Sequence, residues 1–278
     1  MCIICKNIDC FLEDRMKKEY FISSPKTKAG LCNRIKSLVS CMQIADRTGK
    51  TLIINWLKSD GFNCEFSDLF SNRLLHTNSS KLRIHKIKEA HDNYFITETW
   101  RLLPPNIKLE NIQNGNHEMI DFQYQETNNT VIETYIPYFQ SLQITEFIDR
   151  QVNEFAKTFD ENTISIAIRT WIDAPNRQHL FDTEKVLKIF EENQLSTFFI
   201  SSDSEKLINL LSNKYGSKIL SYPKRTYTGD RNSTEGIQDA LIDLLLLSKN
   251  KKLMASANST FSEVAWWFGK CEANVQII

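Results

Sequence analysis

The sequence predicts an α/β protein made of two Rossmann-like domains. Its 278 residues are enough for two domains of about 130 residues each. Residues 20–56 follow the order strand, loop, helix, strand, which is a βαβ unit. From residue 163 onward, apolar strands alternate with helical patterns of about 10–15 residues, as expected for parallel sheets covered on both faces. We place the boundary near Asp160, between an N-terminal domain at 1–160 and a C-terminal domain at 161–278.

The first half begins with an apolar strand at 20–24 and a loop at 25–30. A helix of about 16 residues starts near Asn33, because apolar side chains recur there at helical spacing. Gly49 ends this helix, and a second buried strand follows at 51–56. Further along, the sequence predicts a helical turn at 66–70, strands at 82–87 and 94–98, a polar loop at 106–130 and a helix at 143–159.

The second half alternates more regularly than the first. Strands are predicted at 163–168, 197–201, 219–222, 252–257 and 274–278. Helices are predicted at 182–193, 204–215, 237–248 and 260–268. Gly216 ends the second of these helices. The third is apolar almost all round, yet it carries Asp243 directly before four consecutive leucines.

Composition argues against several classes of function. Lys plus Arg and Asp plus Glu both number 34, so the chain lacks the basic charge of a nucleic-acid binder or of a polybasic membrane patch. The longest apolar runs are too short to span a bilayer, and the N-terminus shows no secretory signal. We therefore expect a soluble, cytoplasmic protein. Seven cysteines, an odd number at irregular spacing, favour free thiols over disulfides or a zinc site.

Polar side chains follow the strands of the second half at the ends where such sheets bind ligands. Arg169 and Asp203 each come shortly after a buried strand. The turn formed by Asn258, Ser259 and Thr260 joins a strand to a helix, where backbone N–H groups attract anions. An arginine, two hydroxyls and unpaired N–H groups suit a nucleoside diphosphate, and a carboxylate suits a base edge or a ribose.

Simpler interpretations exist for the same residues. Arg169 can end a strand at the surface, Thr260 and Glu263 fit a capping box, and Asp243 can form a structural salt bridge. Absent motifs narrow the choice of function further. The sequence contains no GxxxxGK[ST] and no GxGxxG, which disfavours ATPases and NAD enzymes, and no GxSxG, which disfavours serine hydrolases.

Four separated segments resemble the GDP-fucose-dependent fucosyltransferases, the superfamily of the protein O-fucosyltransferases and the α-1,6 and α-1,2 enzymes. The first segment is AGLCNRIKSLVSCMQIADRTGKTLIINW, which contains Gly30 and Asn33. The others are ISIAIRT, FFISSD and ALIDLLLLSKNKKLMASANSTFSEVAWW. Each motif is weak, but the four in this order and spacing are moderately specific and cover roughly half of the chain.

The resemblance implies a GT-B-like fold, in which two Rossmann-like domains face a cleft. The N-terminal domain would face the acceptor, and the C-terminal domain would bind a nucleotide-sugar donor without a metal ion or another cofactor. By position, Arg169 matches the arginine that binds the β-phosphate in the family. Asp243 matches the helix carboxylate that recognises the guanine edge, and Asp203 matches the acid near the nucleoside.

The same resemblance extends to both walls of the cleft. Ser259, Thr260 and Phe261 match the turn that binds the diphosphate in the family. Asn33 matches an asparagine of the cleft, and Arg34 follows it where relatives have Arg or Gln. The predicted donor site therefore draws on both ends of the chain.

Three positions depart from the family pattern. Ala167 stands where the family has a histidine, two residues before the arginine, and Thr170 and Trp171 replace a second arginine and an aspartate of that pattern. The histidine touches the nucleoside, so its loss leaves other donors open, such as a GDP- or UDP-linked deoxysugar or a pentose such as xylose.

The expected reaction is an inverting transfer of a sugar to a hydroxyl of a glycan or glycoconjugate, with fucose from GDP-fucose as the first candidate. Arg169 would stabilise the leaving diphosphate, Asn33 would orient it, and Asp173 is the candidate base for the acceptor hydroxyl. Two other classes of function remain as alternatives to a glycosyltransferase. The chain could be a nucleotide-sugar or glycan-binding protein without turnover, or a structural α/β domain without a site.

Overall fold

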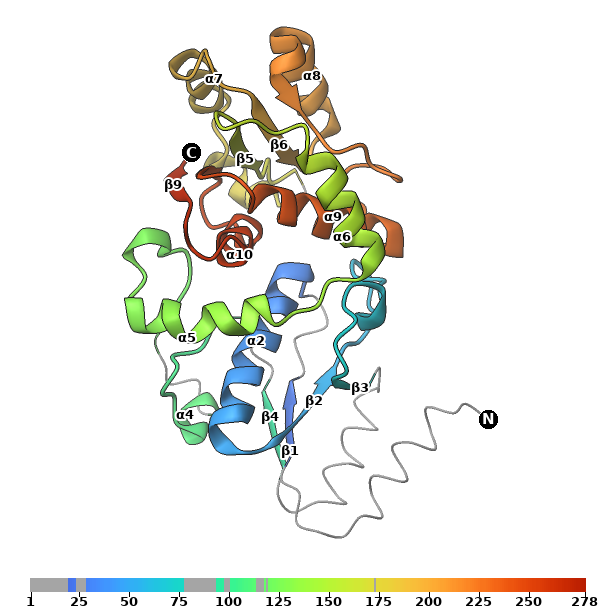
Figure 1. The fold of residues 1–278 in the computed structure, drawn as a ribbon, viewed down its shortest axis with the longest axis vertical. Helices are drawn as coiled ribbons and strands as arrows, with labels where there is room; N and C mark the ends of the chain where they lie inside the picture. The colour runs from blue at the N-terminus through green and yellow to red at the C-terminus, as the bar shows by residue number, and fades with distance from the viewer. Residues whose placement is uncertain are drawn as a thin grey trace.

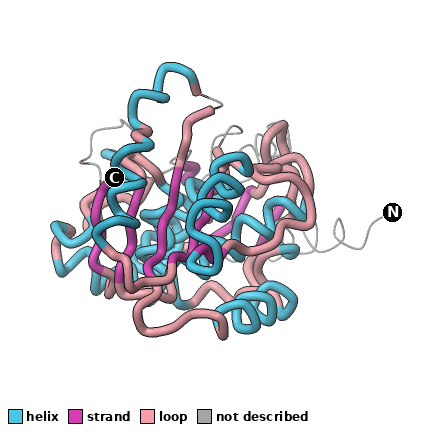
Figure 2. The backbone as a smooth tube through the Cα atoms, turned by 90° about the horizontal axis from the view of Figure 1, so that it is seen from above, coloured by secondary structure: helices cyan, strands magenta, loops and turns pink. Residues whose placement is uncertain are grey.

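The computed structural model describes residues 20–23, 29–77, 94–97, 101–113, 118, 120–172 and 174–278. These residues form two parallel β-sheets, one in each half of the chain (Figure 1). The N-terminal sheet lies in the lower half of that view and the C-terminal sheet in the upper half. Seen from above, helices flank the strands on both sides (Figure 2). The α/β class predicted from the sequence is confirmed.

The N-terminal sheet has the strand order β3-β2-β1-β4, and every pair is parallel. Its strands are β1 (Tyr20–Ser23), β2 (Thr51–Asn55), β3 (Leu75–Thr77) and β4 (Tyr94–Thr97). Helix α2 (Leu31–Thr48) connects β1 to β2, which confirms the βαβ unit. It ends at Gly49, whose φ of 66° is the left-handed C-cap conformation that glycine adopts at little cost.

The part of the chain between β2 and β5 is more helical than predicted. Besides β3 and β4, its described elements are η1 (Phe66–Asp68), α4 (Leu109–Gln113), η2 (Tyr124–Glu126), α5 (Asn129–Gln140) and α6 (Glu146–Ala156). The polar loop at 106–130 is wrong in part, because α4 and η2 lie within it. The sequence did not predict α5, which contains Pro137, a residue that interrupts most helices. The strand predicted at 82–87 lies outside the described residues.

The C-terminal sheet has the order β7-β6-β5-β8-β9, again with every pair parallel. Its strands are β5 (Ile164–Ile168), β6 (Phe198–Ser202), β7 (Ile219–Leu220), β8 (Lys252–Ala255) and β9 (Asn274–Ile277). The helices are α7 (Thr183–Glu192), α8 (Glu205–Tyr215), α9 (Thr234–Leu247) and α10 (Thr260–Phe268), with the 3-10 helices η3 (Pro175–Leu180) and η4 (Gly216–Lys218). Every strand and helix predicted in this half is confirmed. The side chains of Asp182, Ser204 and Ser233 cap α7, α8 and α9, so the helix starts are encoded locally.

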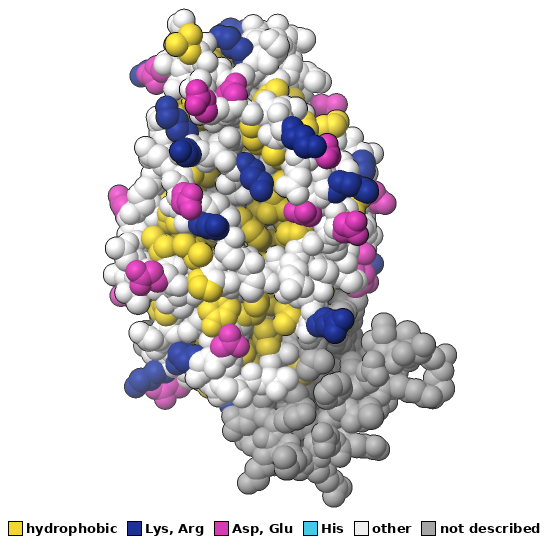
Figure 3. Space-filling view, viewed as in Figure 1, with side chains coloured by type: hydrophobic (Ala, Val, Ile, Leu, Met, Phe, Trp, Pro, Cys, Tyr) yellow, Lys and Arg dark blue, Asp and Glu magenta, His cyan; other side chains and the backbone are white. Residues whose placement is uncertain are grey.

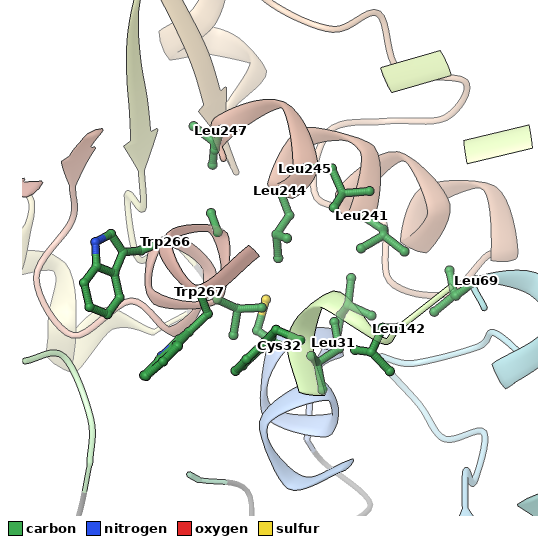
Figure 4. Packing of buried hydrophobic residues seen from close by; sticks show 14 of the residues in the cluster. Leu31, Cys32, Leu69, Leu142, Leu241, Leu244, Leu245, Leu247, Trp266 and Trp267 are labelled. Carbon is green, nitrogen blue, oxygen red and sulfur yellow. The ribbon is translucent and has the colours of Figure 1, made fainter. Parts of the chain in front are cut away.

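One buried apolar cluster joins the two halves (Figure 4). Leu241 and Leu244 of α9 lie opposite Leu31 at the start of α2, and Trp267 of α10 lies beside them. Trp267 also stacks on Phe139 of α5, with ring centroids 5.4 Å apart. Burial of each large side chain stabilises the fold by roughly 1.5–3 kcal/mol. Helix α6 precedes the proposed domain boundary but packs against α9, so the division at 160 and 161 stays a prediction.

The charge distribution on the surface and the state of the cysteines agree with what the composition predicts. Charged side chains of both signs are interspersed over the face shown in Figure 3. The cysteines of the described part are all free thiols, namely Cys32, Cys41, Cys64 and Cys271. Within the described ranges, no helix combines the length and the apolar character that crossing a membrane requires.

Candidate functional site

A cavity of about 680 Å³ is lined by residues from both halves of the chain. The C-terminal half contributes the residues that follow β5, β6 and β8, which is where parallel sheets bind ligands. The N-terminal half contributes the start of α2 and the loops around Phe62 and Asp121. Most of the site residues predicted from the sequence line this cavity, namely Gly30, Asn33, Arg169, Asp203, Asp243, Asn258, Ser259, Thr260 and Phe261.

Arg169 follows β5 directly and is held against Asp203. Its Nη1 lies 2.7 Å from Asp203 Oδ2, and the two side chains are 20% and 10% exposed. Asp203 Oδ1 also accepts hydrogen bonds from the N–H and the hydroxyl of Thr170, at 2.8 and 2.9 Å. The backbone N–H of Arg169 donates to Ser256 Oγ at 2.8 Å. These contacts fix the arginine where β5, β6 and β8 end.

Asp243 is a carboxylate buried on the leucine-rich helix α9, with 4% of its surface exposed. Its Oδ2 accepts a hydrogen bond from Ser201 Oγ at 2.7 Å, and its Oδ1 pairs with the ammonium group of Lys224. Burial raises the pKa of Asp243 above its usual value, and Lys224 and Ser201 oppose that effect. The pair presents a hydrogen-bond acceptor beside a donor at the cavity wall, which is the pattern that a nucleobase edge requires.

The turn before α10 differs from the sequence prediction. Asn258 has a φ of 56°, in the left-handed region that asparagine tolerates better than most residues. The capping box predicted from Thr260 and Glu263 is wrong, because Ser259 is the N-cap and the Glu263 side chain is bonded to Lys36. Ser259 makes no capping hydrogen bond through its side chain. The first N–H groups of α10 are therefore left for another acceptor, as an anion site requires.

At the start of α2, the neighbouring residues Asn33 and Arg34 lie in different environments, although both were predicted as site residues. Gly30 and Asn33 line the cavity, whereas Arg34 is fully buried and does not. Arg34 Nε donates to the carbonyl of Ala29 at 2.8 Å, and its guanidinium lies 4.1 Å from the ring centroid of Phe62. Burial lowers the pKa of Arg34 to about 10. Arg34 thus supports the loop before α2 from behind, and Asn33 reaches the cavity.

A buried ion network beside the cavity was missed by sequence reasoning. Lys36 of α2 is fully buried, and its Nζ lies 2.5 Å from Asp121 Oδ1 and 2.6 Å from Glu263 Oε2 of α10. Arg101 Nη1 lies 3.0 Å from Asp121 Oδ2. Burial raises the pKa of Glu263, and Lys36 opposes that effect. The one local hint in the sequence is a lysine on the face of α2 that carries its apolar residues.

The cavity residues that were not predicted include Trp171, Arg177 and Lys224. Trp171 is buried and carries the guanidinium groups of Arg169 and Arg177 against its ring. Lys224 lies in the segment between β7 and α9, for which the sequence predicts no element. An aromatic residue two positions after a strand-end arginine was the available signal for Trp171.

Two further predictions concern the catalytic base and a metal ion. Asp173, the candidate base, is not among the described residues. In the described part of the chain, no group of three His, Cys, Asp or Glu side chains is placed to hold a metal ion. The cavity wall carries arginines, a lysine, carboxylates and the backbone N–H groups at the start of α10.

Comparison with known proteins finds a likeness in three dimensions. No protein-family model matches the chain, and no curated protein sequence matches it. Among solved structures, NodZ α-1,6-fucosyltransferase of Bradyrhizobium, in a form soaked with GDP-fucose, aligns over 91% of this chain and 93% of its own, with 15% identity and a TM-score of 0.59. A mutant of Arabidopsis thaliana FUT1 in complex with GDP aligns over 98% of this chain and 73% of its own, with 16% identity and a TM-score of 0.59. POFUT1 in complex with GDP aligns over 94% and 98%, with 11% identity and a TM-score of 0.56.

These likenesses extend over both sheets of the chain. At such low sequence identity they establish the fold, because backbone arrangement persists after most side chains have changed. The GT-B-like fold that the four sequence segments imply is therefore confirmed. Of these similar structures, NodZ is an α-1,6-fucosyltransferase soaked with GDP-fucose, and those of FUT1 and POFUT1 are complexes with GDP.

Proposed function

We propose that this protein is a glycosyltransferase that transfers fucose from GDP-fucose to a hydroxyl of a glycan or glycoconjugate. One observation carries the proposal, which is that Arg169, Asp203, Asp243 and Ser259 meet Asn33 around a single cavity. The similar solved structures were obtained with GDP or GDP-fucose, which supports the same donor here.

Each wall of the cavity is assigned to one part of the donor. Arg169 and the first turn of α10 at Thr260 bind the diphosphate, because a guanidinium and helix N–H groups both stabilise phosphate oxygens. Asp203 orients Arg169 and lies near the nucleoside. Asp243 accepts hydrogen bonds from the N–H groups of guanine, and Lys224 donates one to its carbonyl oxygen.

The reaction proceeds with inversion through an oxocarbenium-like transition state. As the bond between the sugar carbon C1 and the phosphate oxygen breaks, the electron pair stays on the diphosphate, and Arg169 stabilises the charge that develops. The acceptor hydroxyl attacks the opposite face of the sugar and loses its proton to a base, for which Asp173 is the candidate. Asp121 is a weaker candidate because its two carboxylate oxygens already pair with Lys36 and Arg101. With these cations in place, the proposal needs no metal ion or other cofactor.

Another donor is the second candidate, and two features favour it. Ala167 stands where the resemblance places a histidine that touches the nucleoside. The pair of Asp243 and Lys224 also fits uracil, which presents an N–H beside a carbonyl. A UDP- or GDP-linked deoxysugar or pentose is therefore tested alongside GDP-fucose.

A thermal-shift screen with GDP, UDP, CDP and ADP identifies the base. A nucleotide at 100 times its dissociation constant stabilises the folded chain by about 2.7 kcal/mol, which such a screen resolves. We expect the largest shift with GDP. A larger shift with UDP assigns a uridine donor, and the absence of a shift with every nucleotide contradicts the donor site.

Arg169→Ala tests the transfer step. We expect kcat for the release of GDP from GDP-fucose to fall by roughly 100- to 1,000-fold, while the circular dichroism spectrum stays unchanged. Arg150→Ala, at an exposed arginine of α6 outside the cavity, is the matched control. Near wild-type turnover in a folded Arg169→Ala variant would contradict the role of Arg169 in the transfer step. A wild-type protein that retains GDP-fucose and releases no GDP is a binding protein instead.

A further inference from the structure

Two arginines flank one tryptophan ring in the wall of the cavity. The ring centroid of Trp171 lies 5.2 Å from the guanidinium carbon of Arg169 and 5.0 Å from that of Arg177. All three residues line the cavity. Arg177 belongs to η3, so the Trp171 ring places a residue of this short helix near Arg169, which follows β5.

Arg177 differs from Arg169 and Lys224 of the cavity in its charge environment. Arg169 pairs with Asp203, and Lys224 pairs with Asp243. No carboxylate in the described part of the chain forms an ion pair with Arg177, and its side chain is exposed. Its positive charge is therefore not neutralised by these residues and is available to an anion in the cavity.

The side chain of Trp171 is held in place by burial and by the conformation of its backbone. Its side chain is only 7% exposed, and its φ of 56° lies in the left-handed region, which is rare for a bulky residue. The carbonyl of Trp171 accepts the N–H of Ala174 at 2.9 Å and closes the turn. Its Nε1–H finds no acceptor among the described residues. Strained backbone and buried unpaired donors concentrate at functional sites, which favours a ligand at this ring.

We propose that Arg177, supported by Trp171, is a second cation for the diphosphate of the donor. This inference rests on the proposed function, because it requires a nucleoside diphosphate in the cavity. A diphosphate carries more negative charge than one arginine neutralises, and Asp203 already offsets part of the charge of Arg169. Arg177 adds a planar guanidinium that binds phosphate oxygens through two N–H groups. Trp171 acts as a positioning residue, because its ring limits the conformations of Arg177.

The test compares GDP with GMP, which lacks the β-phosphate, by calorimetry at low ionic strength. In Arg177→Gln, we expect the Kd for GDP to rise about tenfold and the Kd for GMP to change by less than about twofold. Arg177→Lys keeps the charge and recovers part of the affinity for GDP. Arg150→Gln removes an exposed arginine outside the cavity and leaves both affinities unchanged. If UDP gives the larger thermal shift, the same comparison uses UDP and UMP.

The outcomes separate this inference from the proposed function. Unchanged GDP binding in Arg177→Gln, or an equal loss for GDP and GMP, overturns the role of Arg177 and leaves the donor site in place. A wild-type protein that binds no nucleoside diphosphate overturns both proposals.

Trp171→Leu tests whether the ring of Trp171 positions Arg177. In a folded variant we expect the same selective loss for GDP, and little further loss when it is combined with Arg177→Gln, because both changes remove one interaction. Fully additive losses remove Trp171 from the proposal. If Trp171→Leu does not fold, the Arg177 variants decide the inference alone.

Discussion

Asp230 lies in the cavity wall and starts a chain of hydrogen bonds that leads into α9. Its Oδ1 accepts the N–H of Asn232 at 2.8 Å, and its Oδ2 accepts the hydroxyl of Ser233. Ser233 in turn caps α9 by accepting the N–H of Gly236 at 3.0 Å. Burial by itself would raise the pKa of Asp230, but the hydrogen bonds from Ser233 and Asn232 outweigh it and hold the pKa below its usual value. Ionised Asp230 therefore stabilises the start of the helix that carries Asp243.

Asp230→Asn tests this role through its pH dependence. We expect the variant to lose roughly 1–2 kcal/mol of unfolding free energy at pH 7, because two donors lose a charged acceptor. Since the folded pKa is below the unfolded one, the stabilisation is present above about pH 4 and is lost as the pH falls through the folded pKa. Urea unfolding at a series of pH values should show the difference from wild type shrinking below about pH 4. The exposed Glu161→Gln is the control, and a difference that does not vary with pH contradicts the assignment.

At the scale of elements, α9 and α10 approach their neighbours closely at glycines. A Cβ on Gly236, in the first turn of α9, would lie 2.6 Å from the carbonyl oxygen of Asp230. A Cβ on Gly269, at the end of α10, would lie 2.8 Å from the carbonyl oxygen of Ser248. Real Cβ atoms do not come so near to backbone oxygens. These glycines therefore set how closely α9 packs against the loop before it and against α10.

Gly236→Ala is expected to destabilise the protein although alanine favours helices. The helix propensity of alanine contributes about 1 kcal/mol in its favour, but forcing a methyl group against the backbone of Asp230 costs roughly 1–3 kcal/mol. Displacement of Asp230 also weakens the cap that Ser233 provides. Thermal unfolding should show a lower Tm for Gly236→Ala and an unchanged or slightly higher Tm for Asn209→Ala, at an exposed position of α8. A Gly236→Ala variant as stable as wild type would show that the loop at Asp230 can move aside without a loss of stability.

At the scale of the molecule, the network around Lys36 is a buried ion-pair connection between the halves. It joins α2 to α10 through Glu263 and extends through Asp121 to Arg101 in the cavity wall. The apolar cluster of Figure 4 crosses the same interface. Both connections run through α10, whose first turn belongs to the proposed donor site. Changes in this network are therefore expected to affect the stability of the whole chain and the position of the diphosphate site together.

Lys36→Met tests this connection. Removing the ammonium leaves Glu263 buried without its partner, which we expect to cost roughly 3–5 kcal/mol of unfolding free energy. Lys36→Met combined with Glu263→Leu should recover part of that loss, because a buried ion pair replaced by apolar groups is often neutral. Lys157→Met breaks an exposed pair with Glu154 and should cost less than about 1 kcal/mol. Equal effects of Lys36→Met and Lys157→Met in denaturant titrations would contradict the role of the network.

The sequence by itself determined the features that depend on neighbouring residues. Helical periodicity, the caps at Asp182 and Ser204, and the stop at Gly49 act within a few positions, so the βαβ order could be predicted from them. The same order places Arg169 at a strand end, because parallel strands expose their carboxyl ends at one edge of the sheet. Arg169, Asp203 and the turn of Asn258, Ser259 and Thr260 were predicted as site residues in this way.

Only the tertiary structure decided which polar groups meet. Lys36 bonds to Asp121 and Glu263, which lie 85 and 227 positions away, and no local pattern encodes such a pairing. That long-range contact takes Glu263 away from the capping box that its spacing from Thr260 predicts. Likewise, adjacent residues on a helix point in different directions, so Asn33 reaches the cavity while Arg34 is buried behind it. Local spacing sets the elements, whereas burial and the need to pair each buried charge set the partners.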